Sequence, residues 1–335
     1  MEAKDKMHKE PIKSEGVAVC PLCGVRERSM LYEGLEDRWF GVPGKWNLNL
    51  CKGCGLVFLD PRPTAEDMGR TYSIYYTHQA PVDGRSPISN RSSKSWPITL
   101  LKKVHRWIYT PLFRRQNELY EMYLSHVRPG RLLDVGCGDG RFLKHMRDLG
   151  WTVQGVETDP QSAKLAVDTF GLSVHAGTLE SGGFPTDHFD SVTMSHVIEH
   201  ANDPILLLAE CRRILRPGGM LVIVTPNIQS MGHRYFGRAW RDLDPPRHLY
   251  LFSRKTLNLI VHQAGFVCPK THTSAARVDM ISKGSMQIKE TGRYDETQLS
   301  NRRWGLFSLL FPLLELSVIR FMRNLGEELV LKVQK

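Results

Sequence analysis

The sequence predicts a doubly wound α/β fold built on a parallel sheet, preceded by a small metal-binding module. Two observations predict the sheet. The stretch from Arg131 to Phe142, RLLDVGCGDGRF, has the pattern of a buried strand that ends on a glycine turn and restarts as a helix. Three later strand patterns, each followed by a turn or helix, repeat this order. Two Cys-x-x-Cys-Gly pairs near the N-terminus predict the metal module.

The glycine turn predicts a ligand site. The apolar residues Leu132, Leu133 and Val135 are typical of a strand covered on both faces. Gly136, Gly138 and Gly140 then allow a tight turn and a close approach of the backbone to a ligand, just before a helix whose amides face the same place. A glycine string alone is weak evidence, so a ligand site also requires suitable strands later in the chain.

The later units supply that context. Val153 to Glu157 forms a second short strand that ends in a carboxylate, as expected if Glu157 accepts hydrogen bonds from two ribose hydroxyls. Phe189 to Met194 is a strand that leads into the segment from Ser195 to His200. A Pro-Gly-Gly turn after Arg216 then precedes a strand from Met220 to Val224.

The motifs DVGCGDG, GVE, FDSVTMSHVIEH and RPGGMLVIVTPN, in this order, resemble those of class I S-adenosylmethionine-dependent methyltransferases, over roughly Leu119 to Gly265. The resemblance implies a Rossmann-like seven-stranded sheet and S-adenosylmethionine (SAM) as cofactor. It implies that the glycine turn contacts the methionine end, that Glu157 contacts the ribose and that residues 178–179 contact the adenine. A sheet that binds another nucleotide, or one that has lost its ligand, is the alternative. The cofactor-binding residues predicted on this basis are Asp134, Gly136, Cys137, Gly138, Glu157, Thr178, Leu179 and Ser195.

The length, composition and charge of the chain limit its possible domain organisation and partners. A chain of 335 residues allows two domains or one domain with appendages. The charged N-terminal segment lacks the apolar core of a secretory signal, so we expect a cytoplasmic protein. A formal net charge of +10 favours a polyanionic partner or an anionic membrane, or reflects solubility alone. We predict a disordered N-terminus over residues 1–16, a zinc ribbon over 17–62, a linker and helical arm over 63–110, and the catalytic domain over 111–335 with an insertion over 276–326.

Four of the seven cysteines predict a structural zinc site. Cys20 and Cys23 form one pair, Cys51 and Cys54 the other, and four thiolates on two tight turns are the tetrahedral set that Zn²⁺ prefers. Free or catalytic cysteines are the alternative. Zinc ribbons often touch nucleic acid, but this segment also resembles the N-terminal zinc module of sugar C-methyltransferases. There it would serve as a lid or substrate platform, with Tyr72, Tyr75 and Tyr76 lining an acceptor pocket or packing beside it.

The segment after the ribbon predicts a mobile linker over residues 77–96, followed by helices over 95–105 and 111–127. This arm would cover the cofactor or the acceptor. Towards the C-terminus we expect a sixth strand from Phe266 and a last strand from Glu328 to Val333, antiparallel at the sheet edge, as in the family that the motifs resemble.

Three histidines are candidate general bases, since methyl transfer to a hydroxyl or an acidic carbon requires removal of a proton. His196 and His200 would share one face of a helix, and His248 lies in the loop after the fifth strand. As alternatives, His196 packs at the edge of the cofactor, His200 caps the helix and His248 stabilises the turn. Because some quinone O-methyltransferases resemble the VIEH segment, a divalent ion held by Glu199 and His200 is a further hypothesis. Four arginines in the same region either grip an anionic group of the acceptor or form a solvated basic face: Arg234, Arg238, Arg241 and Arg247.

Residues 304–319 are strongly apolar but shorter than the ~20 residues of a membrane span. Flanked by arginines up to residue 323, this segment either lies in a membrane interface or packs over the active site or a dimer contact. If the segment lies in a membrane interface, we expect the protein at the inner face of the membrane and a lipid-linked acceptor.

We therefore predict a SAM-dependent methyltransferase acting on a small molecule or a glycan precursor, such as a nucleotide-linked or lipid-linked sugar. The rival hypothesis is an RNA-modifying methyltransferase that uses the ribbon and the basic charge. An Asn/Asp-Pro-Pro-aromatic motif after the fourth strand is usual in base-modifying enzymes of this fold, and Ser195-His196-Val197-Ile198 stands in its place. A binding module that keeps the cofactor without catalysis is the third hypothesis.

Overall fold

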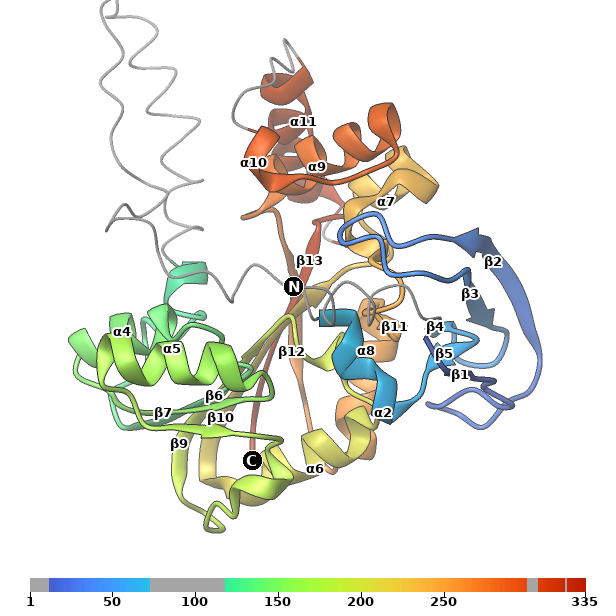
Figure 1. Ribbon diagram of the computed structural model, residues 1–335. Coiled ribbons are helices and arrows are strands. Elements are labelled where there is room, and N and C mark those ends of the chain that lie inside the picture. The colour runs from blue at the N-terminus through green and yellow to red at the C-terminus, as the bar shows by residue number, and fades with distance from the viewer. Residues whose placement is uncertain (1–11, 73–117, 300–306, 323) are drawn as a thin grey trace, which may run out of the picture.

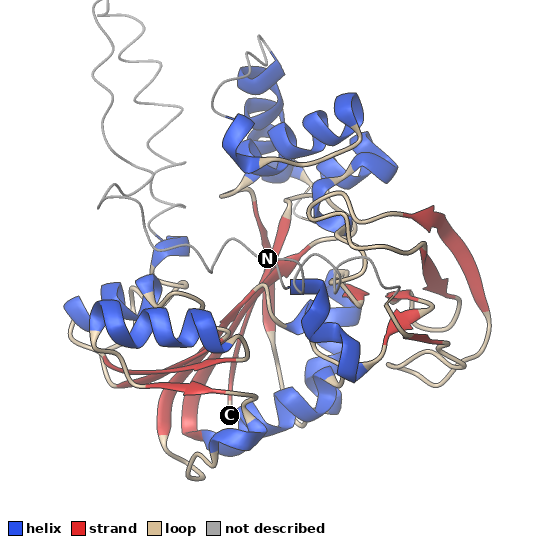
Figure 2. Cartoon of the chain, in the orientation of Figure 1, coloured by secondary structure: helices blue, strands red, loops and turns tan. Residues whose placement is uncertain are grey.

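A seven-stranded sheet forms the centre of the computed structural model, which describes residues 12–72, 118–299, 307–322 and 324–335 (Figures 1 and 2). Six strands run parallel and β13 runs antiparallel between two of them. This is the predicted doubly wound α/β sheet. In spatial order the strands are β12 (Lys270–Ser274), β13 (Glu328–Gln334), β10 (Leu215–Pro226), β9 (Phe189–Ser195), β6 (Arg131–Val135), β7 (Thr152–Glu157) and β8 (Val174–Ala176).

The sheet is buried on both faces, which explains why its strands are continuous apolar runs. Successive residues of β6 point to opposite faces, so Leu132 packs with Val222 and Val330 on one side of the sheet. Leu133 packs with Ile223 on the other side. Helices close both layers: α4 (Arg141–Asp148), α5 (Pro160–Phe170), α6 (Pro204–Ile214) and α8 (Arg254–Gln263).

Local sequence fixes the starts of these helices. Asp159 accepts hydrogen bonds from the Gln161 and Ser162 amides at the first turn of α5, and Pro160 occupies the first helical position. Asp203 and Pro204 repeat this pattern in α6. These starts follow strands β7 and β9, so loops at the carboxyl edge of the sheet lead into capped helices.

The N-terminal module is a second, antiparallel sheet. It contains β2 (Arg28–Leu35), β3 (Trp46–Cys51) and β4 (Val57–Leu59), and its fourth strand, β11 (Tyr250–Leu251), comes from the loop after β10. The loop after β10 therefore completes the sheet of the N-terminal module. Smaller elements of this module are β1 (Ser14–Glu15), β5 (Arg62–Pro63), α2 (Ala65–Met68) and the turn η1 (Gly69–Tyr72).

A helical cluster stands on the carboxyl edge of the sheet (Figure 1). It contains α9 (Val278–Thr291), α10 (Glu296–Leu299) and α11 (Phe307–Phe321), inserted between β12 and β13, and it packs on α7 (Met231–Phe236). Short turns complete the chain: η3 (Glu180–Gly182), η4 (Ile198–His200), η5 (Gly237–Ala239) and η6 (Arg241–Leu243). Within the described residues, every helix is too short or too polar to cross a bilayer.

Several expectations about elements are wrong. Ser14–Glu15 pairs with Arg62–Pro63 as a strand, so the predicted disorder does not extend to residue 16. The predicted helix over 111–127 does not continue through Met122 and Tyr123, whose φ angles of 45° and 57° are left-handed. The sixth strand begins at Lys270 instead of Phe266 because a turn follows α8.

The predicted place of the last strand is also wrong. The strand is antiparallel, as expected, but β12 adds outside it, so β13 lies one position in from the edge. Predictions for Tyr75, Tyr76, the linker over 77–96, the helix over 95–105 and residues 300–306 lie outside the described residues.

Candidate active site

The predicted cofactor loop brings a backbone amide against a carboxylate. The Gly138 amide donates a 2.8 Å hydrogen bond to Glu157 Oε2, across the carboxyl ends of β6 and β7. Gly136 and Gly138 have φ angles of 74° and 54°, which only glycine adopts readily. A Cβ at Gly136 would lie 2.5 Å from Val197, whereas one at Gly138 would meet nothing within 4 Å, so the second glycine faces open space. The bend therefore leaves room beside Glu157 for a ligand that lies close to the backbone.

Asp134 lies buried at the end of β6, where it accepts a 2.7 Å hydrogen bond from the Thr193 hydroxyl. Burial raises its pKa to about 7; the Thr193 hydrogen bond opposes this shift and the charge of Glu157 adds to it. A cation bound beside Asp134 would favour its ionised form. The carboxyl group is thus suited to a positively charged ligand group.

The other predicted cofactor residues lie on the same edge or beneath it. Ser195 ends β9, half-buried, and Thr178 is exposed just after β8, where its side chain accepts from the Ser181 amide. Leu179 and Cys137 are buried, and Cys137 packs with Leu143 and Ala166 under the turn.

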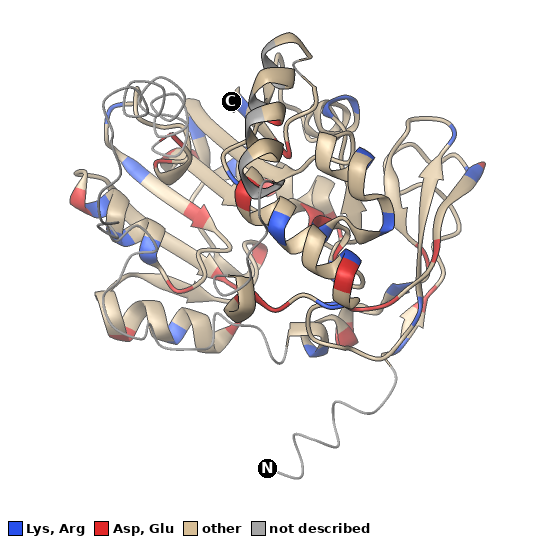
Figure 3. Cartoon of the chain, turned by 90° about the horizontal axis from the view of Figure 1, so that it is seen from above, with Lys and Arg blue, Asp and Glu red and all other residues tan. Residues whose placement is uncertain are grey.

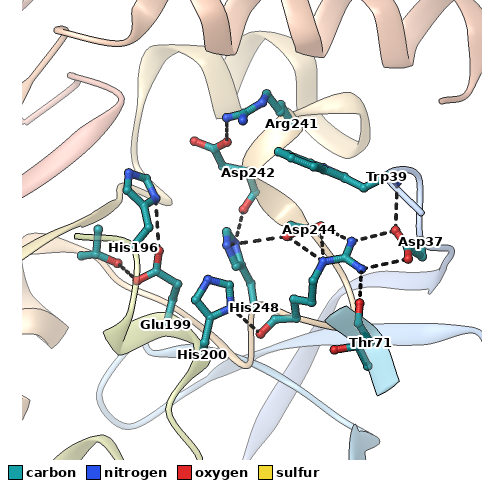
Figure 4. Close-up of polar contacts among 12 residues, drawn as sticks. Asp37, Trp39, Thr71, His196, Glu199, His200, Arg241, Asp242, Asp244 and His248 are labelled. Carbon is teal, nitrogen blue, oxygen red and sulfur yellow. Dashed lines mark hydrogen bonds and ion pairs between the residues drawn. The ribbon is translucent and has the colours of Figure 1, made fainter. Parts of the chain in front are cut away.

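His196 is held between two buried carboxylates, those of Glu328 and of Glu199, and Figure 4 shows its contact with Glu199. Its Nδ1 lies 3.3 Å from Glu199 Oε1 and its Nε2 lies 2.9 Å from Glu328 Oε1. Burial and the charge of Arg277 lower the pKa of His196, but the two carboxylates outweigh them and raise it to about 9. Since carboxylates only accept hydrogen bonds, both ring nitrogens carry protons in this arrangement.

His196 and His200 do not share a helical face. His196 has a left-handed φ of 55°, and the chain then forms only the single turn η4. This geometry turns the His200 ring away, towards His248, with ring centroids 4.7 Å apart.

His200 and His248 are each fixed by a backbone carbonyl. His200 Nδ1 lies 3.0 Å from the Arg247 carbonyl oxygen and 2.8 Å from the Tyr72 hydroxyl, and His248 Nδ1 lies 2.7 Å from the Asp242 carbonyl oxygen. Donation through Nδ1 leaves Nε2 of each ring as a lone-pair acceptor. Burial and the nearby His248 lower the pKa of His200 to about 4, so its imidazole is neutral at pH 7.

Glu199, His200 and His248 also form a donor set for a divalent cation. Ligand atoms from the three lie within 4.8 Å of one another. The buried Glu199 Oε1 has the 3.3 Å ion-pair contact with His196 Nδ1, while its Oε2 accepts from the Thr225 hydroxyl at 2.8 Å. The rings are oriented by carbonyl groups, as metal-binding histidines usually are. The predicted pair of Glu199 and His200 is thus joined by His248, which lies 48 positions after His200 in the numbering of the chain.

The N-terminal module reaches this site through a fully buried ion pair (Figure 4). Arg247 donates to both oxygens of Asp37, at 2.7 and 2.9 Å, and also pairs with Asp244. Seen from above, the loops that cross between the large sheet and the N-terminal module carry acidic segments (Figure 3). Sequence reasoning missed Asp37 because nothing in the local pattern of residues 33–41 distinguishes it from a surface aspartate.

The four arginines do not converge on one anion. Arg247 and Arg241 are buried and paired with aspartates, and Arg241 also lies 4.5 Å from the Trp39 ring centroid. Arg238 is exposed and donates to the Glu33 carbonyl at 2.8 Å, and Arg234 is exposed. Arg241 and Arg247 therefore hold the loop and the N-terminal module together.

The four predicted zinc ligands are brought together. The Sγ atoms of Cys20 and Cys54 lie 3.6 Å apart and those of Cys23 and Cys51 lie 3.4 Å apart, and all four fall within 4.8 Å of one another. A tetrahedron with Zn–S bonds of ~2.3 Å has edges of ~3.8 Å, so the set fits Zn²⁺. Each pair is followed by a glycine with positive φ, 71° at Gly24 and 87° at Gly55, whose amide closes the turn onto the first cysteine carbonyl.

Comparisons with known proteins match part of the chain to methyltransferases. A family model described as a methyltransferase domain matches residues 109–270. The chain is 37% identical over 117 residues to a ubiquinone biosynthesis O-methyltransferase of Cereibacter sphaeroides, covering 33% of this chain and 47% of that protein. A protein of the same description from Parvibaculum lavamentivorans is 32% identical over 110 residues, covering 31% and 44%. The chain thus spans less than half the length of these curated relatives.

Among solved structures, a SAM-dependent methyltransferase from Archaeoglobus fulgidus superposes with a TM-score of 0.44 at 18% identity, covering 71% of this chain and all of that one. A possible histamine N-methyltransferase from Thermotoga maritima gives 0.45 at 22% identity, covering 70% and 95%. The family match, the sequence relatives and the sheet order together identify the catalytic region. Residues 109–270 match a methyltransferase domain, and the chain carries this domain on a Rossmann-like sheet.

Proposed function

We propose that this chain transfers the methyl group of SAM to an oxygen atom of a small-molecule acceptor. The observation that carries the proposal is the contact between the Gly138 amide and Glu157 at the carboxyl edge of the sheet. A carboxylate and a glycine bend at this position suit a nucleoside with a ribose diol. When bound, SAM supplies an electrophilic methyl group on a sulfonium. Asp134, Gly136 and Gly138 would hold its methionine end, Glu157 its ribose, and Thr178 and Leu179 its adenine.

We assign the acceptor side to His200 and His248. Both nitrogens of His196 are occupied by carboxylates, so His196 has no lone pair for the acceptor proton and instead positions Glu199. His200 presents Nε2, to which the described residues offer no hydrogen-bond partner, while its Nδ1 is fixed by the Arg247 carbonyl. We infer that His200 Nε2 takes the proton from the acceptor hydroxyl as the carbon–oxygen bond forms.

The donor set of Glu199, His200 and His248 favours a second way to achieve the same step. A divalent cation held there would lower the pKa of an acceptor hydroxyl and orient it. Adding Mn²⁺ to chelator-treated protein distinguishes the general-base mechanism from the metal mechanism. The general-base mechanism predicts no change in methyl transfer. The metal mechanism predicts that transfer recovers, and that His248→Gln abolishes this recovery.

The zinc module would act in the same proposal as one wall of the site. We propose that Cys20, Cys23, Cys51 and Cys54 hold a structural Zn²⁺, since four thiolates leave no open coordination position. The module then supplies Tyr72 to His200 and Asp37 to Arg247. The name shared by the two curated relatives supports an O-methyl acceptor. A glycan precursor remains one candidate acceptor class.

The experiment is transfer of a labelled methyl group from SAM into extracts separated into small-molecule, lipid and nucleic-acid fractions. We expect label in the small-molecule or lipid fraction, and much less label with the Glu157→Ala variant at the same SAM concentration. Label in RNA, resistant to small-molecule depletion, would support the rival RNA-modifying function. Cofactor binding without label in any fraction would support the binding module.

A further inference from the structure

Exposed apolar side chains are concentrated on the helical cluster at the carboxyl edge. Leu310, Leu314 and Phe321 of α11 are 54%, 56% and 86% exposed, and Met322 follows at 59%. Tyr235 of α7, 54% exposed, joins this face through its ring contact with Phe311, at 5.5 Å between centroids. We call these five residues, Tyr235, Leu310, Leu314, Phe321 and Met322, the apolar face.

The periodicity of α11 separates this face from the packed one. Leu310, Leu314 and Phe321 follow the spacing i, i+4 and i+11, which places them in one stripe of a helix. Phe311 and Glu315 lie ~100° further round the helix and are buried, and Glu315 accepts from the Glu327 amide at 3.1 Å. The helix therefore packs on the protein through one stripe, and among the described residues a second apolar stripe is exposed to solvent.

Basic side chains border the apolar face. Lys289 of α9 is exposed and its Nζ lies 5.4 Å from the Tyr235 ring centroid, and the exposed Arg234 precedes Tyr235. Apolar residues framed by lysine and arginine are typical of segments that lie in the headgroup region of anionic bilayers. A second copy of a chain with a formal net charge of +10 would instead bring like charges together.

The position of the cluster relates this surface to the acceptor side. The chain passes from α11 into Glu328, which pairs with Pro226 at the carboxyl end of β10 and contacts His196. We propose that the apolar face docks on an anionic lipid bilayer, lying in its interface, and presents the carboxyl edge of the sheet to the membrane. This goes beyond the proposed function, and it implies an acceptor with an apolar portion that partitions into lipid.

The test is flotation of the full-length protein with vesicles of equal parts phosphatidylcholine and phosphatidylglycerol, and with pure phosphatidylcholine. We expect strong binding to the anionic vesicles and weak binding to the neutral ones. A double variant, Leu314→Ser with Phe321→Ser, should lose on the order of tenfold or more in partitioning, since both side chains would leave lipid. Lys289→Glu should weaken only the binding to anionic vesicles.

Val267→Ser is the matched control, because Val267 is 67% exposed outside the cluster. It should bind vesicles like the parent. The proposal is overturned if the parent stays unbound, if Val267→Ser reduces binding as much as the double variant, or if light scattering shows a dimer that the double variant abolishes while vesicles have no effect. Calorimetry with SAM on the same samples tests the proposed function separately from vesicle binding. Unchanged SAM binding also shows that the variants fold.

Discussion

Arg247 and Asp37, separated by 210 positions in the chain, form a two-pronged ion pair whose side chains are both fully buried. Arg247 precedes His248 and its carbonyl contacts His200, so the pair ties the N-terminal module directly to the proposed acceptor side. Asp244 supplies a second carboxylate to the same guanidinium. This relationship explains how a module outside the large sheet can influence chemistry at its edge.

Arg247→Met should cost ~3–5 kcal/mol of the free energy of unfolding, because two buried carboxylates lose their counterion. Asp37→Asn should cost less, about 1–3 kcal/mol, because Asp244 still neutralises Arg247. Urea unfolding measures both. Arg62→Met, which breaks the half-exposed pair with Glu15, is the control and should cost at most ~1 kcal/mol. Equal costs for Arg247→Met and Arg62→Met would contradict the role assigned to the buried pair.

Removal of zinc should loosen the acceptor loop as well as the N-terminal module. Asp37 lies between β2 and β3 of the proposed zinc module, so its position depends on the fold that the metal would stabilise. Chelator or Cys54→Ser should lower the melting temperature and increase hydrogen exchange over residues 240–252. Cys268→Ser, at an exposed cysteine outside the cluster, should change neither. A loss confined to residues 17–62 would show that the coupling is absent.

Affinity for SAM should fall as the pH is lowered from about 8 to about 6. Burial raises the pKa of Asp134 from its ordinary value to about 7, so the carboxyl group takes up a proton over this interval and no longer balances a cationic ligand. Binding of a cation favours the ionised form of Asp134. Below pH 7, where the carboxyl group is protonated, binding therefore releases a proton. Calorimetry in two buffers of different ionisation enthalpy measures that proton. Asp134→Asn should bind more weakly and without proton release; an unaltered pH profile in this variant would exclude Asp134 as the titrating group.

His200→Gln should reduce methyl transfer about 10²- to 10⁴-fold while SAM affinity changes little, because the ring is assigned to the acceptor and not to the cofactor. Tyr72→Phe should have a smaller effect, since the Arg247 carbonyl still fixes the His200 ring. The measurement is single-turnover transfer to the acceptor fraction that accumulates label. His188→Gln, whose side chain lies away from the acceptor side next to Phe189, is the matched histidine control. If His200→Gln retains the parental rate, the base is a different residue.

The parts of the fold that sequence predicted are those with local causes. The glycine bend after β6, Glu157 at the end of β7 and the two cysteine turns are each specified by neighbouring residues. The position of β13 within the sheet is not local: it depends on Lys270–Ser274 pairing outside it, after an insertion of about 50 residues. Strand order of this kind has no signature in a short window.

The acceptor side shows the same limit. The three histidines could be named from their places after β9 and β10, but their partners could not. His196 is defined by Glu328, 132 positions away, and His200 by Tyr72, 128 positions earlier. A weak signal existed in Glu327 and Glu328, two acids that directly precede the apolar run from Leu329 to Leu331, because a charge buried there requires a partner.

The central claim is that the Gly138 bend and Glu157 bind the nucleoside of SAM, and titration calorimetry with SAM and its demethylated product measures it most directly. The parent should bind both compounds, and Glu157→Ala should weaken each by about tenfold to a hundredfold, since charged hydrogen bonds to the ribose are lost. Glu180→Ala removes an exposed acid just beyond β8 and should leave both affinities unchanged. Absence of binding by the parent, or equal affinities for the parent and Glu157→Ala, would contradict the account.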